Sequence, residues 1–150
     1  SRVEGEARAA LALGVERETL GDILVSEGSA DLIVSAGVAQ YLLDNWTGAG
    51  RTALRLTVIG AHFGGYSEWE SSLLYKGLDN VYFDTSSTLP FLDKTEAVKL
   101  LRNLGVERFF FGTDFPMWRP KDELERFLSL PLSEKEKQMI LHENFEKVFK

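Results

Sequence analysis

The chain passes from an apolar run into a polar turn within residues 109–116, which read FFFGTDFP. A short apolar run bounded by turn residues is typical of a strand that is buried on both faces of a parallel sheet. Gly112, Asp114 and Pro116 then favour a turn. The segment therefore predicts a buried strand that carries the Asp114 carboxylate at its C-terminal end.

Two earlier segments repeat this order. Residues 56–61 (LTVIGA) are followed by His62 and two glycines, and residues 81–83 (VYF) are followed by Asp84. In α/β folds the residues that perform chemistry lie at the carboxyl ends of parallel strands. We therefore expect His62, Asp84 and Asp114 to share one edge of a three-stranded sheet.

Helical patterns separate and follow these strands, which indicates an α/β fold with right-handed crossovers. Ala97, Leu100, Leu101 and Leu104 form one apolar face, and Gly105 ends that helix. A second helix is expected after Pro120, and it should bury one apolar face made of three side chains: Leu124, Phe127 and Leu128.

Two serines are followed by glutamate three residues later, which is the pattern of a capping box. Ser67 with Glu70 predicts a short helix that stops near Gly77, and Ser133 with Glu136 predicts the last helix, which runs to Phe149.

Residues 1–50 show weaker patterns. Helices are expected over Glu4–Leu13 and Glu18–Glu27, a strand over Asp31–Ser35 and a short helix over Ala39–Asn45. Tyr41, Leu42 and Trp46 are the apolar residues of the last helix.

Composition changes near residue 50. All ten Phe lie at or after position 63, the first Lys is at position 76, and residues 1–50 hold eight acidic but only three basic residues. We therefore treat residues 1–50 as a separate, poorly assigned segment and residues 51–150 as the α/β part. One interpretation is a truncated gene with an altered reading frame upstream.

The 150 residues suit one domain. A net charge of −6 without a basic stretch argues against nucleic acid as a partner. The chain has no Cys, which excludes disulfides and thiolate metal sites. No apolar run approaches the ~20 residues of a membrane span, and no signal peptide is evident. We expect a soluble, cytoplasmic protein.

The polar residues at the strand ends are the candidates for chemistry. His62 can bind a divalent metal ion or carry a proton, although a histidine hydrogen-bonded in a turn explains the pattern equally well. Asp114 at a strand end favours metal binding or proton transfer over simple turn capping. Asp84, together with Thr85, Ser86 and Ser87, favours a turn in which these side chains satisfy backbone groups, over contact with a substrate. His142 belongs to a solvated helix face. Trp118, directly after the Asp114 turn, is a candidate substrate contact.

Four segments together resemble one known family: residues 57–67 (TVIGAHFGGYS), 80–86 (NVYFDTS), 111–116 (FGTDFP) and the tail 133–149 with Asn144. They resemble the amidohydrolase-related (amidohydrolase 2) family. That family includes metal-dependent hydrolases and decarboxylases of the aminocarboxymuconate-semialdehyde type.

The resemblance implies that the three strands are the sixth, seventh and eighth of an incomplete (β/α)₈ TIM-like barrel. It implies that His62 is the strand-six histidine, a metal ligand or proton carrier, and that Asp114 is the strand-eight aspartate, a metal ligand and general base. The implied ion is Zn²⁺ or another divalent metal. The family's His-x-His on strand one and its strand-five His have no counterpart, because the chain has only His62 and His142.

Three functions follow from the resemblance. The first is a metal-dependent hydrolase of a small-molecule substrate, inactive as this chain alone. The second is a metal-dependent carboxy-lyase. The third is a non-catalytic fragment that binds no metal and acts as an interaction module. Three strands leave open edges, so we expect self-association or a complementing N-terminal fragment as partner.

Overall fold

A computed structural model describes residues 13–25, 30–46, 48–49, 52–53 and 56–149. It divides into two compact units, Ser1–Leu56 and Thr57–Lys150, here called the N-terminal and C-terminal units. Each is described by itself. Within the described ranges, no helix is both long and apolar enough to cross a membrane.

The N-terminal unit contains an antiparallel pair of strands, β1 (Leu20–Val25) and β2 (Ala30–Val34). Helix α2 (Ala36–Asn45) follows, with Ser35 as its N-cap. A 3₁₀ turn η1 (Arg17–Thr19) precedes β1, and a two-residue ladder joins β3 (Gly48–Ala49) to β4 (Thr52–Ala53). The small core of this unit centres on three buried side chains: Val15, Leu42 and Trp46.

Two predictions for this unit are confirmed and one is wrong. The strand expected at Asp31–Ser35 and the helix expected at Ala39–Asn45 correspond to β2 and α2. Over the helix expected at Glu18–Glu27, the structure has the end of η1 and then strand β1, while residues 26 and 27 lie outside the described residues. Gly21, which weakens a helix, suits the strand, because a Cβ there would lie 3.0 Å from the Ile33 carbonyl oxygen across the ladder. The helix expected over Glu4–Leu13 lies outside the described residues except for Leu13.

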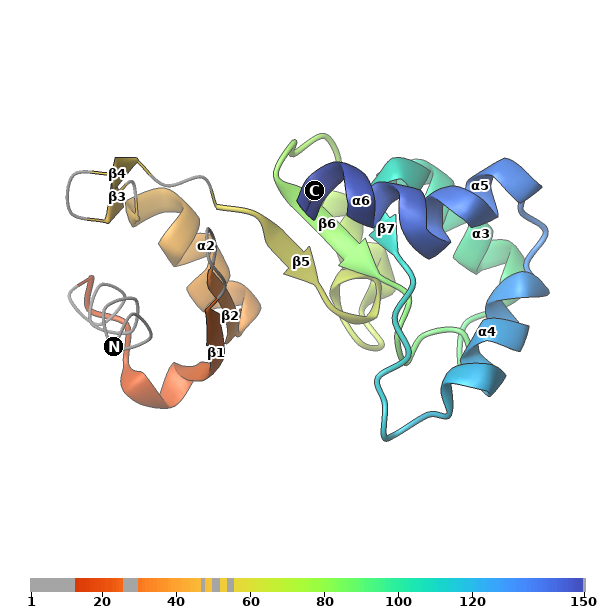
Figure 1. The fold of residues 1–150 in the computed structure, drawn as a ribbon, viewed down its shortest axis with the longest axis horizontal. Helices are drawn as coiled ribbons and strands as arrows, with labels where there is room; N and C mark the ends of the chain where they lie inside the picture. Colours follow the sequence, from red (N-terminus) through yellow and green to blue (C-terminus); the bar gives the residue numbers. More distant parts are fainter. Residues whose placement is uncertain (1–12, 26–29, 47, 50–51, 54–55, 150) are drawn as a thin grey trace. The chain divides into compact units, whose positions relative to one another are not determined.

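The C-terminal unit contains the three strands that the sequence predicts: β5 (Val58–Gly60), β6 (Val81–Asp84) and β7 (Phe109–Phe110). They form one parallel sheet in the order β5-β6-β7, with β6 in the middle (Figure 1). Gly60 pairs with Phe83, and Phe83 pairs with Phe109. This register brings the carboxyl ends of all three strands to the same edge, as expected.

Four α-helices and a π-helical turn accompany the sheet. They are α3 (Lys94–Leu104), α4 (Pro120–Leu128), α5 (Glu134–Gln138), the π-helix η5 (Met139–Glu143) and α6 (Asn144–Phe149). Three 3₁₀ segments connect the elements: η2 (His62–Gly64), η3 (Trp69–Tyr75) and η4 (Val106–Arg108). The α3 prediction is confirmed, including its end at Gly105.

The core lies on one face of the sheet. Phe83 stacks on Phe109 with ring centroids 5.2 Å apart, and Phe63 lies 4.9 Å from Phe109. All three rings are fully buried, and the apolar face of α3 packs in the same cluster. Burying one such side chain contributes about 2–3 kcal/mol, so this cluster is the main source of the unit's stability.

The opposite face of the sheet is less covered than two-sided burial predicts. Tyr82 stacks on Phe110 at 5.4 Å, and Phe145 and Phe149 of α6 contact Phe110. Ile59, however, is 46% exposed, and Phe145 is 53% exposed. The expectation that these strands are buried on both faces is therefore only partly met.

Two further details differ from the sequence predictions. The Ser67 to Glu70 capping box is wrong: Ser67 has φ +59°, and η3 begins after Glu68 without a side-chain cap. On α4 the buried residues are Glu123 and Phe127, whereas Leu128 is 44% exposed. The buried face of α4 therefore includes Glu123 and does not include Leu128, in contrast to the face predicted from the sequence.

The second capping box is confirmed and extended. The Ser133 side chain accepts from the Glu136 N–H, and the Glu136 carboxylate accepts from the Ser133 N–H at 2.7 Å. The same carboxylate accepts hydrogen bonds from Nε and Nη2 of Arg102, at 3.0 and 3.2 Å. This pairing ties α5 to α3. The Arg102 guanidinium first, and the Ser133 N–H second, lower the pKa of Glu136 from 4.5 to about 2.

We predict that Glu136→Gln lowers the free energy of unfolding by about 1 kcal/mol at pH 7, because Gln can keep the capping box but loses the charge that pairs with Arg102. Because the folded pKa lies below the unfolded one, this contribution is present above pH 4.5. It declines as the pH falls towards the folded value. Urea unfolding from pH 7 to pH 2.5 measures it, with Glu134→Gln as the exposed control. A constant difference between Glu136→Gln and wild type across that range would contradict the prediction.

Candidate active site

His62 lies directly beyond β5, where the backbone turns sharply. His62 and Phe63 both have left-handed φ angles, +58° and +59°, which is uncommon for residues with large side chains. Each such residue costs of order 1–3 kcal/mol, and the complete burial of Phe63 in the core offsets this cost. Phe63 therefore acts as an anchor that holds His62 at the edge of the sheet.

The glycines of this turn serve packing. A Cβ on Gly64 would lie 2.9 Å from the Phe83 ring, and a Cβ on Gly60 would lie 2.9 Å from the Cα of Gly64. Gly64 also has φ +88°. These glycines allow the turn after β5 to approach Phe83 closely.

The hydrogen bonds of His62 define which ring nitrogen carries the proton. Nδ1 lies 2.9 Å from Ser86 Oγ and 3.2 Å from the Ser86 carbonyl oxygen. Ser86 Oγ donates its only hydrogen to Asp84 Oδ1 at 2.5 Å. Both Ser86 oxygens can therefore only accept from Nδ1, so Nδ1–H is the donor. Nε2 of the neutral ring is left with its lone pair, which is the form that binds a metal or accepts a proton.

Asp84 holds the loops after β5 and β6 together. Its Oδ1 accepts from the His62 N–H and the Ser86 N–H, both at 2.9 Å, and from Ser86 Oγ. A carboxylate oxygen with three donors is fully engaged in the turn. The structural interpretation of Asp84 from the sequence agrees with this arrangement.

A second hydrogen-bonded group starts from the next residue of the same loop. Ser87 Oγ donates to Asp114 Oδ2 at 2.5 Å and accepts from Trp118 Nε1 at 3.0 Å. Ser87 is buried, whereas Asp114 is exposed. Ser87 and Asp114 have left-handed φ angles of +47° and +55°. The loop after β6 thus supports His62 through Ser86 and Asp114 through Ser87.

An aromatic rim links the two groups. Tyr66 lies 6.2 Å from the His62 ring, Phe91 lies 5.8 Å from Tyr66, and Trp118 lies 5.9 Å from Phe91, each measured between centroids. Tyr66 and Phe91 are more than half exposed. Exposed rings beside a polar edge are suited to contact a planar or apolar ligand.

The described residues do not form a complete metal site. Within them, no three His, Cys, Asp or Glu side chains gather closely enough to hold an ion. His142 is exposed on η5, as the sequence predicts. His62 and Asp114 would supply at most two ligands, and catalytic zinc sites have three from protein. A divalent metal therefore does not fit the described residues by themselves.

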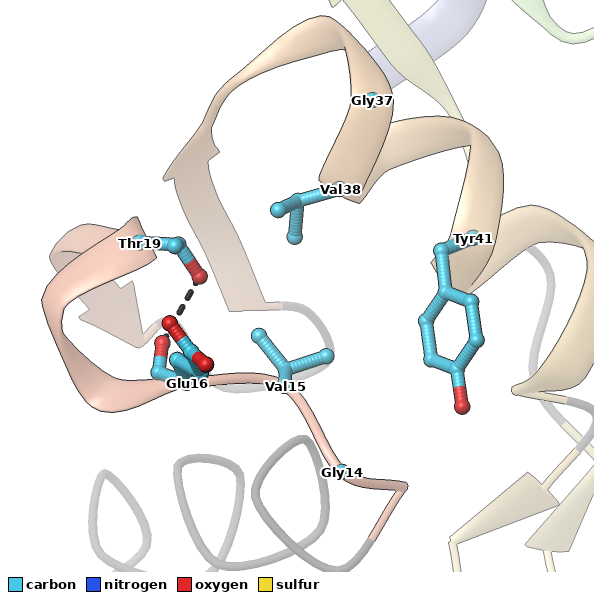
Figure 2. A pocket seen from close by; sticks show the side chains of 7 residues that line it. All are labelled: Gly14, Val15, Glu16, Thr19, Gly37, Val38 and Tyr41. Atoms are coloured by element: carbon cyan, nitrogen blue, oxygen red, sulfur yellow. Dashed lines mark hydrogen bonds between the residues drawn. The ribbon is translucent and has the colours of Figure 1, made fainter.

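The N-terminal unit has a pocket of different character (Figure 2). Val15 and Val38 line it together with Tyr41, whose hydroxyl donates to the Leu13 carbonyl oxygen at 2.5 Å. Among the described residues that line it, the only carboxylate is that of Glu16. These described residues offer neither a nucleophile with a base nor a group of metal ligands.

Comparison with known proteins identifies the family of the chain. The amidohydrolase family model matches residues 48–150. The chain belongs to the amidohydrolase family. This confirms the resemblance seen in the four sequence segments.

Solved structures support the same assignment at the level of fold. Dihydroxybenzoic acid decarboxylase from Polaromonas sp. JS666, solved with bound manganese and 2-nitroresorcinol, is 20% identical with a TM-score of 0.53. The match covers 75% of this chain and 39% of that one. For 2,6-dihydroxybenzoate decarboxylase from Rhizobium the identity is 19%, the TM-score 0.54 and the coverage 75% and 40%.

A putative 2-pyrone-4,6-dicarboxylic acid hydrolase from Pseudomonas putida is 19% identical with a TM-score of 0.54, covering 75% of this chain and 46% of that one. The chain thus spans less than half the length of these structures. A mixed α/β fold that matches part of amidohydrolase barrel enzymes is confirmed. The numbering of its strands as six, seven and eight stays a prediction.

A second family model, described as a putative RNA-binding domain in YlmH, matches residues 9–62. No curated protein matches the chain.

Sequence reasoning identified His62, Asp114 and Trp118, and the structure brings the last two together through Ser87. Their roles remain predictions. The sequence assigned Ser86 and Ser87 to the turn after β6 but did not predict their hydrogen bonds to His62 and Asp114, because serines after a strand are usual in any turn. Tyr66 and Phe91 carry no signal in the sequence beyond their aromatic character.

We predict that Asp84→Ala lowers the free energy of unfolding of the C-terminal unit by about 2–4 kcal/mol, because it leaves two backbone N–H groups without their acceptor. Asp84→Asn should cost clearly less, because its Oδ1 can still accept from both. Urea unfolding measures both variants, with the exposed Asp79→Ala as control. Equal losses for Ala and Asn would contradict this account of Oδ1.

Proposed function

We propose that the C-terminal unit supplies part of the catalytic edge of a metal-dependent enzyme of the amidohydrolase family, and that this enzyme hydrolyses a small-molecule substrate. The observation that carries the proposal is the pair of supports from adjacent residues, Ser86 for His62 and Ser87 for Asp114. Membership of the amidohydrolase family supports a catalytic interpretation of this geometry.

Asp114 and His62 have complementary roles in the proposal. The exposed Asp114 carboxylate takes a proton from the attacking water, while Ser87 fixes its orientation. His62, with Nδ1–H held by Ser86, uses Nε2 to receive or return a proton. Trp118 and the exposed rings of Tyr66 and Phe91 contact the substrate.

A carboxy-lyase is the second candidate. It is favoured by the similarity of fold to the Polaromonas and Rhizobium decarboxylases, while the Pseudomonas protein is named as a putative hydrolase. In this case His62 or Asp114 delivers the proton that replaces the departing carboxylate. The two reactions use the same proton carriers, so the geometry of the edge serves both.

The proposed enzyme requires more ligands than the described residues supply. A divalent metal is associated with the family, as the manganese of the Polaromonas structure illustrates. The third and further ligands must come from outside the described residues, either from a complementing N-terminal fragment or from another copy. We keep Zn²⁺ as the proposed ion.

We predict that the chain alone binds Zn²⁺ with a dissociation constant above about 1 μM and shows no hydrolase or decarboxylase turnover, because two ligands are too few for a tight catalytic site. Isothermal titration measures the affinity. A sub-micromolar site with 1:1 stoichiometry would contradict the prediction.

The place of weak binding is a sharper test of the proposed function. Substoichiometric Mn²⁺ should broaden NMR signals around His62 and Asp114 first, and Asp114→Asn should abolish that broadening. His142→Ala, which removes the other histidine, should leave it unchanged. Broadening that survives Asp114→Asn would remove the basis for the site.

We also propose that the chain self-associates. In the described part of the chain no fourth strand joins β5-β6-β7, so β5 and β7 are edges, and exposed parallel edges pair with other chains. Ile59, Phe145 and Phe149 add exposed apolar surface.

Sedimentation velocity at several concentrations should show dimers or larger species that dissociate on dilution. Phe145→Glu combined with Phe149→Glu should shift the distribution towards the monomer. Leu74→Glu, at an 83% exposed position on η3, is the control. A wild-type monomer that does not change with concentration would refute the proposal.

The absence of a nucleic-acid partner also remains a proposal. Residues 9–62 match a putative RNA-binding domain, yet they hold six acidic residues against three arginines. Phosphate contacts by Lys and Arg supply most non-specific affinity, which reaches a dissociation constant of about 10⁻⁴–10⁻⁶ M. Fluorescence anisotropy with a single-stranded RNA should therefore show binding weaker than about 10⁻⁴ M. Micromolar affinity that falls as the salt concentration rises would contradict the proposal that the chain has no nucleic-acid partner.

A further inference from the structure

A buried carboxylate lies on the helix next to the Asp114 turn and has no place in the proposed chemistry. Glu123 of α4 is 0% exposed, and its Oε2 has no hydrogen-bond partner in the described part of the chain. Burying a charged group is costly unless it is paired. Its Oε1 is paired with Arg126, one turn further along α4.

Arg126 connects this carboxylate to the site. Its guanidinium carbon lies 5.4 Å from the centroid of the Trp118 ring, within the range of a cation–π contact. Because the buried carboxylate restrains one side of the guanidinium, its position over the indole is restrained too. Phe91 meets the same indole edge-on at 5.9 Å, so the ring of Trp118 is held from two directions.

The orientation of Trp118 determines the direction of the Ser87 hydroxyl. An indole N–H can only donate, and a serine hydroxyl has one hydrogen and two lone pairs. Trp118 Nε1–H therefore occupies a lone pair of Ser87 Oγ at 3.0 Å, and the single hydrogen of Ser87 points to Asp114 Oδ2 at 2.5 Å. If the indole tilts away, the hydroxyl is free to rotate.

We propose that Glu123 is a positioning residue for Asp114, acting through Arg126, Trp118 and Ser87. It does not touch substrate; it keeps the guanidinium over the indole, and the indole keeps the hydroxyl directed at the carboxylate. The importance of Asp114 rests on the proposed function, whereas the chain of contacts does not depend on it.

The test uses the indole N–H signals of the full chain in ¹H–¹⁵N NMR spectra at constant pH. The chain has three Trp, and loss of one signal in Trp118→Phe assigns the reporter. Ser87→Ala removes the acceptor of Trp118 and defines the full effect on its chemical shift and its exchange with solvent.

Glu123→Gln should move the Trp118 signal towards its position in Ser87→Ala and speed its exchange by about threefold, the size of one partly exposed cation–π contact. Glu125→Gln, on the same helix but paired only with Lys121 at 3.9 Å, is the matched control and should leave the signal unchanged. The signals of Trp69 and Trp46 should stay unchanged in both variants.

A second variant covers the case in which Glu123→Gln does not fold. Glu123→Gln with Arg126→Met removes both charges, so no unpaired buried charge remains, and it should give the same change at Trp118. The ¹³C signal of the Asp114 carboxyl, assigned with Asp114→Asn, should move in this variant and in Ser87→Ala but not in Glu125→Gln.

Unchanged Trp118 and Asp114 signals in a folded Glu123→Gln variant, or in the double variant, would overturn the proposal. Equal changes at all three indoles would do so too, because they would indicate general loosening rather than positioning. These measurements need neither metal nor substrate, so their failure leaves the proposed function standing. If the Mn²⁺ experiment finds no site at His62 and Asp114, the proposed function fails. The positioning contacts are then still tested by the Trp118 and Asp114 signals.

Discussion

The stack of Phe63, Phe83 and Phe109 is the constraint on which the rest of the C-terminal unit depends. Phe83 and Phe109 lie in register on neighbouring strands, so their stacking aligns the carboxyl ends of β6 and β7. Phe63 reaches the same cluster from the turn after β5. Its burial offsets the left-handed backbone at His62 and Phe63. The apolar stack thus fixes the position of the polar edge of the sheet. The stack can form because Gly64 has no Cβ that would clash with the Phe83 ring.

The loop after β6 makes hydrogen bonds to both candidate site residues, His62 and Asp114. Ser86 and Ser87 are adjacent, and their hydroxyls point to different partners, Asp84 and Asp114. Asp84 fixes Ser86, which in turn leaves Nδ1 of His62 as a donor. A hydroxyl has only one hydrogen to donate. Each serine that donates it to an aspartate must therefore accept from its other partner. The loop therefore acts on orientation and tautomer, which is what proton carriers require.

The described part of the chain does not contain a complete metal site. It belongs to the amidohydrolase family, yet it spans less than half of the solved structures that it matches. Within the described residues no group of three ligands forms, and the sheet has three strands with two open edges. In the proposed function, further strands of a barrel would pair with those edges and, at their carboxyl ends, bring ligands to the same side as His62 and Asp114. Under that proposal, one addition would complete both the site and the sheet.

The sequence by itself determined the strand runs, α3, the capping box at Ser133 and the polar residue after each strand, because these depend on local apolar patterns and turn chemistry. It misassigned β1 as a helix, since pairing with β2 outweighs local propensity. Only the tertiary structure decided that Gly64 serves packing, that Glu123 is buried and that Ser87 joins Trp118 to Asp114. These are contacts between residues up to 31 positions apart, and no spacing along the chain encodes them.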